Sequence, residues 1–154
     1  MGYSITWCAV REATAQKLLE QLALSPTGGT EEFPESLISF ARLATGWRVL
    51  WYNEYGCPFL RPEDLSAISA GQDVLLCLVE EHVMASSSQL WAGGERRWWI
   101  SHEGEHGPKG LDTDGELPEC FPAIRQQMEG AQRAAGGAVA DVDYLFEFPL
   151  KGAQ

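Results

Sequence analysis

Residues 87–100 read Ser-Ser-Gln-Leu-Trp-Ala-Gly-Gly-Glu-Arg-Arg-Trp-Trp-Ile, two runs with aromatic residues joined by a Gly-Gly dipeptide. A Gly-Gly pair in this setting is typical of a two-residue β-turn, because both turn positions need a positive φ angle that glycine adopts without strain. The stretch therefore predicts a β-hairpin. With the turn at the two glycines, the expected cross-strand pairs are Ala92–Glu95, Trp91–Arg96 and Ser88–Trp99.

This register divides the hairpin and its extensions into two faces, because successive side chains of a strand point to opposite sides. One face is predicted to join the core and holds Val83, Ala85, Trp91, Trp98, Ile100 and, further along, His102. The other face is mostly polar and holds Glu80, His82, Met84, Ser86, Ser88, Arg97, Trp99, Ser101, Glu103 and Glu105. Large aromatic side chains concentrate at interface hot spots, so Trp99 on the polar face is predicted to be a binding anchor. The alternative is that one of the protein's own helices covers it.

Outside the hairpin, the apolar patterns predict further strands and three helices. Strands are expected at residues 3–10, 37–44, 47–53, 73–79 and 143–150, and the fourth of these runs on into the hairpin. Helices are expected at residues 11–24, 61–71 and 118–135. Single helices between hairpins give the order β-α-ββ-α-ββ-α-β. This order predicts an α+β fold, a mostly antiparallel sheet of about six strands with helices packed on it.

Length and charge limit the function further. The 154 residues are expected to form a single domain, 1–154. The net charge of −11 argues against binding to nucleic acid or anionic lipid, since both would repel the protein, and it favours a cationic partner. No apolar run approaches the roughly 18 residues of a membrane span, and the first residues lack the pattern of a secretory signal. The protein is therefore expected in the cytoplasm, without membrane contact.

An acidic loop follows the hairpin. Between residues 103 and 119 a single lysine, Lys109, stands among six carboxylates: Glu103, Glu105, Asp112, Asp114, Glu116 and Glu119. The order Asp112-Thr113-Asp114-Gly115 resembles the start of a calcium loop, but the glycine comes one position too early and Phe121 stands where the bidentate glutamate belongs. The loop is therefore interpreted as an acidic surface, without a metal.

Four segments carry a resemblance that spans nearly the whole chain. They are Ser25-Pro26-Thr27-Gly28 after the first strand and helix, Val79-Glu80-Glu81-His82-Val83-Met84, Trp99-Ile100-Ser101-His102-Glu103-Gly104, and Asp141 to Leu150. In these segments the chain resembles a widespread family of small, uncharacterised bacterial single-domain proteins, a resemblance that implies no activity. In size, acidity and lack of a catalytic motif it is also similar, in general character, to bacterial toxin-immunity proteins.

The leading hypothesis is a non-enzymatic acidic binding module of the immunity type. Such a protein would neutralise a cognate bacterial toxin or effector by occluding its basic active site. The residues predicted to bind this protein partner are Trp99, Glu103, Glu105, Asp112, Asp114 and Glu116. No catalytic residue, metal or cofactor is assigned, and the sequence leaves the oligomeric state open.

Two alternatives remain. The predicted register places Glu105 opposite His82, with Glu80 and Glu103 close by, and an imidazole among carboxylates could support a metal-assisted hydrolase. Against this, no metal-binding motif of high information content is present. The other alternative is a housekeeping domain whose acidity serves solubility alone.

Overall fold

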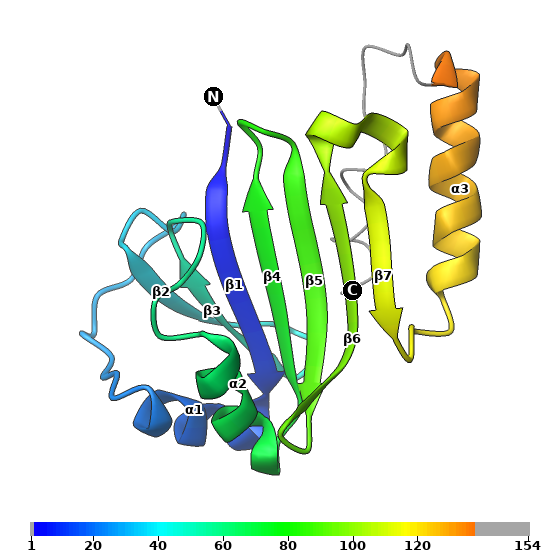
Figure 1. Ribbon diagram of the computed structural model, residues 1–154. Helices are drawn as coiled ribbons and strands as arrows, with labels where there is room; N and C mark the ends of the chain where they lie inside the picture. The colour runs from blue at the N-terminus through cyan, green and yellow to red at the C-terminus, as the bar shows by residue number, and fades with distance from the viewer. Residues whose placement is uncertain (1, 138–154) are drawn as a thin grey trace.

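The computed structural model describes residues 2–137. Within this range the chain forms an antiparallel sheet of seven strands in the order β2-β3-β1-β4-β5-β6-β7, with three α-helices (Figure 1). The strands are β1 (Ser4–Arg11), β2 (Ile38–Arg42), β3 (Trp47–Tyr52), β4 (Val74–Glu80), β5 (Ala85–Ala92), β6 (Glu95–Glu103) and β7 (Leu111–Gly115). The helices are α1 (Ala15–Gln21), α2 (Pro62–Ile68) and α3 (Phe121–Ala134), and short 3-10 segments are η1 (Glu12–Thr14), η2 (Ser69–Gly71) and η3 (Gly104–Lys109).

The predicted fold class is confirmed, with a somewhat larger number of strands than expected. One additional strand is β7, which lies in the segment that was interpreted as an acidic loop. The other arises because β4 and β5 are separate, adjacent strands. The strand predicted at residues 143–150 lies outside the described residues.

A tight turn separates β4 from β5, so the prediction that the strand at 73–79 runs on into the hairpin was wrong. Glu80 pairs with Ala85, and the chain reverses over the four residues between them. Within the turn Met84 has a φ of 53°, and its N–H donates to the carbonyl of Glu81 at 3.3 Å. The carboxylate of Glu80 also accepts the backbone N–H of His82 at 3.2 Å. These hydrogen bonds satisfy backbone N–H groups within the turn. The turn contains no glycine or proline, so the sequence does not mark it.

The glycine turn of the hairpin is confirmed, but its register changes two residues beyond the turn. Gly93 and Gly94 have φ angles of 62° and 80°. The pairs Ala92–Glu95 and Trp91–Arg96 form as predicted, whereas Ser88 pairs with Ile100. A β-bulge causes this shift: Leu90 pairs with Trp98, so Arg97 is an extra residue on β6.

The bulge places two tryptophans on opposite faces of the sheet, so the prediction of a shared face was wrong. A shift of one residue exchanges the two faces of a strand. Trp91 therefore packs with α1 and α2, and Trp98 packs with α3. The same exchange turns Ser86 and Ser88 into the side of the sheet that carries Trp98, where both are buried.

Helices cover parts of both faces. We call the two sides the α2 face and the α3 face. The α2 face carries Leu50 and Leu76, which belong to one core cluster with Leu18 of α1 and Leu65 of α2. The α3 face carries Trp98 and Ile100, which form a second cluster with Phe121 and Met128 of α3. None of the described helices has the length and apolarity needed to cross a bilayer.

Helix α1 is shorter than predicted and ends in a Schellman motif. The N–H of Leu24 donates to the carbonyl of Leu19 at 2.9 Å, and that of Ala23 donates to Glu20 at 3.1 Å. This geometry gives Ala23 a φ of 53°, a left-handed conformation that costs an L-residue about 1–2 kcal/mol.

Replacing Ala23 by glycine should therefore stabilise the protein. The relief of strain exceeds the added entropy of the unfolded chain, so we expect a gain of about 0.5–1 kcal/mol. For a chain of this size the gain corresponds to a rise in melting temperature of about 2 °C, measurable by calorimetry. A fall in the melting temperature would contradict this helix end.

Candidate functional site

Strand pairing arranges the α2 face in rows, because directly paired residues of antiparallel strands lie side by side. One row crosses the sheet from β3 to β7 as Leu50, Cys8, Leu76, Gln89, Trp99 and Asp114. The next row runs as Tyr52, Thr6, Leu78, Ser87, Ser101 and Asp112. Both rows are mainly buried and apolar over β3, β1 and β4, and they become polar and more accessible over β5, β6 and β7.

The accessible part of these rows, together with the neighbouring Arg96 and Glu103 of β6, is the candidate site, which we call the open face. It comprises the α2-face side chains of the last three strands: Ser87, Gln89, Arg96, Trp99, Ser101, Glu103, Asp112 and Asp114. Figure 1 shows α1 and α2 gathered at one end of the sheet, near β1 and β3, with α3 next to β7. Trp99 is partly buried, and no hydrophobic cluster of residues 2–137 includes it. Packing of the described helices on the α2 face thus stops short of Trp99.

Trp99 lies beside one cation and one carboxylate. The guanidinium carbon of Arg96 lies 5.4 Å from the centre of a Trp99 ring. The same guanidinium is 3.9 Å from the carboxylate of Asp114, and both side chains of this ion pair are exposed. Exposed pairs of this kind contribute at most about 1 kcal/mol. Asp114 can therefore exchange Arg96 for a cation of a partner at little cost.

The structure brings four of the six predicted site residues together on the open face: Trp99, Glu103, Asp112 and Asp114. Glu105 lies in η3, the connection from β6 to β7, and Glu116 directly follows β7, where its N–H donates to the carbonyl of Arg97 at 2.9 Å. These two carboxylates flank the open face at the two ends of β7.

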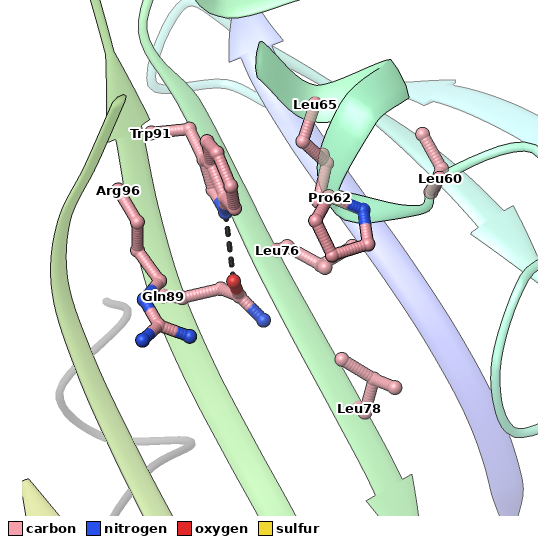
Figure 2. Close-up of a pocket in the computed structure, with 8 residues that line it drawn as sticks. All are labelled: Leu60, Pro62, Leu65, Leu76, Leu78, Gln89, Trp91 and Arg96. Carbon is pink, nitrogen blue, oxygen red and sulfur yellow. Dashed lines mark hydrogen bonds between the residues drawn. The ribbon is translucent and has the colours of Figure 1, made fainter. Parts of the chain in front are cut away.

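A groove next to the open face was not predicted. It has a volume of about 530 Å³, and its apolar walls come from Leu60, Pro62, Leu65, Leu76, Leu78 and Trp91 (Figure 2). Its polar end is formed by Gln89 and Arg96, which also belong to the open face. The indole N–H of Trp91 donates to the side-chain oxygen of Gln89 at 2.7 Å. The groove was missed because it forms only where Leu65 of α2, Leu76 of β4 and Trp91 of β5 meet in space.

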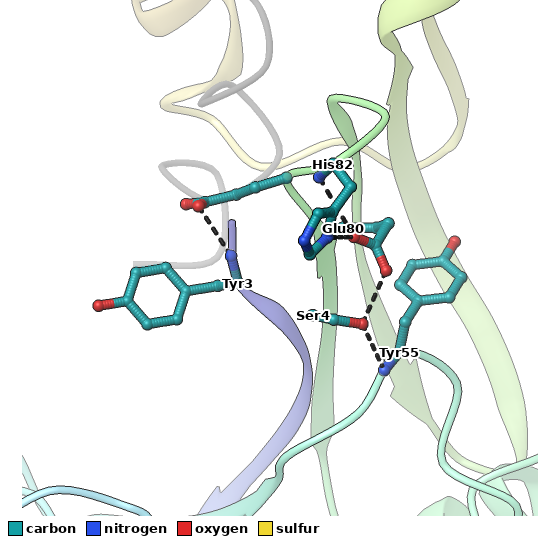
Figure 3. A network of polar contacts seen from close by, with 6 residues as sticks. Tyr3, Ser4, Tyr55, Glu80 and His82 are labelled. Carbon is teal, nitrogen blue, oxygen red and sulfur yellow. Dashed lines mark hydrogen bonds and ion pairs between the residues drawn. The ribbon is translucent and has the colours of Figure 1, made fainter. Parts of the chain in front are cut away.

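His82 and Glu80 form a contact, but Glu103 is not part of it. The imidazole Nδ1 of His82 is 2.5 Å from the carboxylate of Glu80 (Figure 3). The backbone of Glu103 lies two strands from that of Glu80, about 10 Å away. The carboxylate of Glu103 is 3.2 Å from Nδ1 of His106 instead. The predicted pairing of Glu105 with His82 was wrong, because His82 lies in the turn between β4 and β5.

The Glu80 carboxylate joins three segments of the backbone. It accepts a hydrogen bond from the hydroxyl of Ser4 at 2.7 Å, and the N–H of Tyr55 donates to the same hydroxyl at 3.1 Å (Figure 3). The hydrogen bond from Ser4 and that from His82 together hold the pKa of Glu80 below its ordinary value of 4.5. This network connects the start of β1, the turn after β4 and the loop after β3, which is a structural role.

This lowered pKa predicts how stability changes with acidity. The charged form of Glu80 stabilises the fold above the carboxyl's ordinary pKa, and the contribution is lost as the pH falls through the lower pKa of the folded state. Thermal melts of wild type and Glu80→Gln should therefore differ most near neutral pH and converge in acid. Glu32→Gln, an exposed site outside the network, is the control. A difference that stays constant with pH would contradict this role.

No family model, no curated protein and no solved structure matches the chain. The resemblance to small bacterial proteins therefore stays an expectation from the sequence. The open face and the groove beside it are the features of this molecule from which a function can be inferred.

Proposed function

We propose that this protein is a non-enzymatic binding module, and that it recognises a basic protein partner through the open face. One observation supports this most. A partly exposed tryptophan, Trp99, pairs with Asp114 and shares its face of β6 and β7 with Asp112 and Glu103, on a part of the sheet that the core clusters of the described residues do not reach.

Tryptophan and carboxylates would contribute to different steps of binding. The net charge of −11 attracts a cationic protein over the Debye length, about 8–10 Å at ordinary salt, and raises the rate of association. The carboxylates then orient the partner by pairing with its Lys and Arg side chains. Trp99 loses its remaining contact with water in the complex, which slows dissociation.

The most concrete form of this proposal is an immunity-type protein. The open face would cover the basic active site of a cognate toxin or effector, such as the cleft of a nuclease, and exclude its anionic substrate. The carboxylates of β6 and β7 suit this role because they can pair with the Lys and Arg side chains of the toxin that otherwise bind its anionic substrate.

A co-expression experiment tests the proposal. A toxin-like gene next to the gene of this protein is expressed alone and together with it, while growth and complex formation are measured. The proposal predicts growth arrest by the toxin alone, growth in its presence, and a complex that survives purification. It is wrong if co-expression gives neither growth nor a complex.

The alternative proposal, a metal-assisted hydrolase with His82, Glu80 and Glu103, has weaker support. The contact between His82 and Glu80 favours it, but the Glu103 carboxylate lies 3.2 Å from His106, and among the described residues Glu103 is close enough to share a metal with Glu105 and His106 rather than with that pair. Metal analysis of the purified protein, with melting curves before and after chelation, separates the two proposals. A stoichiometric divalent ion whose removal lowers the melting temperature would favour the hydrolase.

A further inference from the structure

We infer that the groove beside the open face is the apolar subsite of the same interface, and that it receives one apolar side chain of an extended, basic segment of the partner. The inference rests on the proposed function and adds the chemistry of the partner. It specifies an apolar residue followed four positions later by Lys or Arg.

The chemistry of the groove favours an apolar side chain. Its floor is formed by Leu76 and Leu78 of β4, and Leu60 and Leu65 stand opposite Trp91 (Figure 2). The indole N–H of Trp91 already donates a hydrogen bond to Gln89, so a side chain bound in the groove would contact the apolar ring of Trp91. A groove with these walls gains by removing an aliphatic or aromatic side chain from water.

The groove is continuous with the carboxylates of the open face. Gln89 and Arg96 line both, and Arg96 touches Trp99 and Asp114 in turn. Moving across the strands, the order is therefore an apolar groove over β4 and β5, an aromatic and cationic strip on β6, and two carboxylates on β7, Asp112 and Asp114.

Strand spacing sets the distance between the two subsites. Adjacent strands lie about 4.8 Å apart, so β7 lies roughly 10–14 Å from the middle of the groove. An extended chain advances about 3.3 Å per residue, and its alternate side chains share one side. An offset of four residues covers about 13 Å and points both side chains at this protein. An offset of two is too short, and an offset of six is too long.

The strip between the subsites restricts the middle position. When the first side chain of the bound segment fills the groove, the side chain two positions later lies over Trp99 and Arg96. A cation is disfavoured beside the Arg96 guanidinium, whereas an uncharged side chain can pack on the indole. The expected pattern is apolar, then uncharged at offset two, then Lys or Arg at offset four.

A peptide series tests this pattern without altering the protein. Labelled peptides of Ser and Gly carry one Leu and one Lys at an offset of two, four or six, and fluorescence anisotropy measures their affinities. The peptide with offset four should bind roughly fivefold more tightly than the other two, as expected of one surface ion pair. Replacing its Leu by Ser should weaken binding by at least about tenfold, since the groove then stays empty.

Protein variants identify the subsites. D112N/D114N should remove the preference for offset four, and Leu78→Gln should remove the preference for Leu over Ser. Because the peptide substitutions already test each subsite in the wild-type protein, poor folding of Leu78→Gln would not decide the outcome.

The results separate the two proposals. If Leu and Ser peptides bind equally while D112N/D114N weakens both, the groove inference is wrong and the acidic open face stands. If no peptide binds, or if D112N/D114N and Trp99→Ala leave every affinity unchanged, the groove inference is also wrong. Growth arrest that persists on co-expression, with no complex formed, overturns the proposed function separately. If decanoate binds the groove more tightly than any peptide does, the groove is a small-molecule site and the inference fails.

Discussion

Replacing Trp98 by alanine is expected to lower the free energy of unfolding by about 3–5 kcal/mol. Trp98 is 5% exposed and packs against Phe121 and Met128 of α3. Removing its indole leaves a cavity in the cluster that joins α3 to the sheet, and the cavity adds to the lost transfer free energy. Urea denaturation followed by circular dichroism measures the loss, which corresponds to a fall in melting temperature of roughly 10 °C.

The adjacent tryptophan is the control for this prediction. Trp99→Ala removes the same indole from a position outside the core clusters of residues 2–137, so it should cost about 1 kcal/mol or less. The two variants therefore compare the two faces of β6. Equal losses from Trp98→Ala and Trp99→Ala would contradict the assignment of these neighbours to opposite faces.

Trp99→Ala should instead reduce the affinity for the protein partner by about 2–4 kcal/mol, or roughly 30- to 1000-fold. Trp99 lies at the centre of the open face, between Gln89 of β5 and Asp114 of β7. A partner that covers this face removes the indole from water, and central aromatic residues contribute most to such interfaces. Isothermal titration calorimetry with the toxin identified by co-expression measures the change.

Trp47→Ala is the matched control for Trp99→Ala. Trp47 is also partly buried, and it has the guanidinium of Arg11 4.0 Å from its ring centre. It lies on β3 and, because Leu50 points to the α2 face, Trp47 points to the other side. Its truncation should leave affinity unchanged. The open face is the wrong surface if Trp47→Ala weakens binding and Trp99→Ala does not.

Local signals in the sequence predicted most elements of the fold. Gly93-Gly94 specified the hairpin turn because few other residues adopt two successive positive φ angles. A strand was predicted at residues 73–79, and β4 forms there, between β1 and β5. The helix predicted from residue 61 begins at Pro62, where the carboxylate of Asp64 accepts the N–H of Arg61 at 3.1 Å.

Two of the errors came from features without a sequence signature. The bulge at Arg97 inserts one residue between two ordinary pairs, and Arg-Arg-Trp-Trp looks the same with or without it. The turn after Glu80 contains no glycine or proline that would mark it in the sequence. Each feature moves side chains to the opposite face, so small errors in register became large errors in burial.

The candidate site was predictable only in part, for a related reason. Trp99 and Glu103 keep their place on β6 relative to each other whatever strand they pair with, because a strand's own alternation fixes them on one face. The groove depends on Leu65 of α2, Leu76 of β4 and Trp91 of β5 meeting in space. Contacts between residues so distant in sequence arise from tertiary packing, which local patterns do not encode.

The most direct test of the open face compares two variants of equal net charge. E103Q/D112N/D114N neutralises the three carboxylates of the open face, and E20Q/E32Q/E35Q neutralises three exposed carboxylates on α1 and the loop after it. Affinity for the toxin identified by co-expression is measured for both by calorimetry at low and moderate salt. We predict that the first variant loses at least roughly tenfold in affinity and most of its salt dependence, while the second binds as wild type does, apart from a small change in association rate. Equal losses from the two variants, or wild-type affinity in the first, would contradict a binding site on the open face.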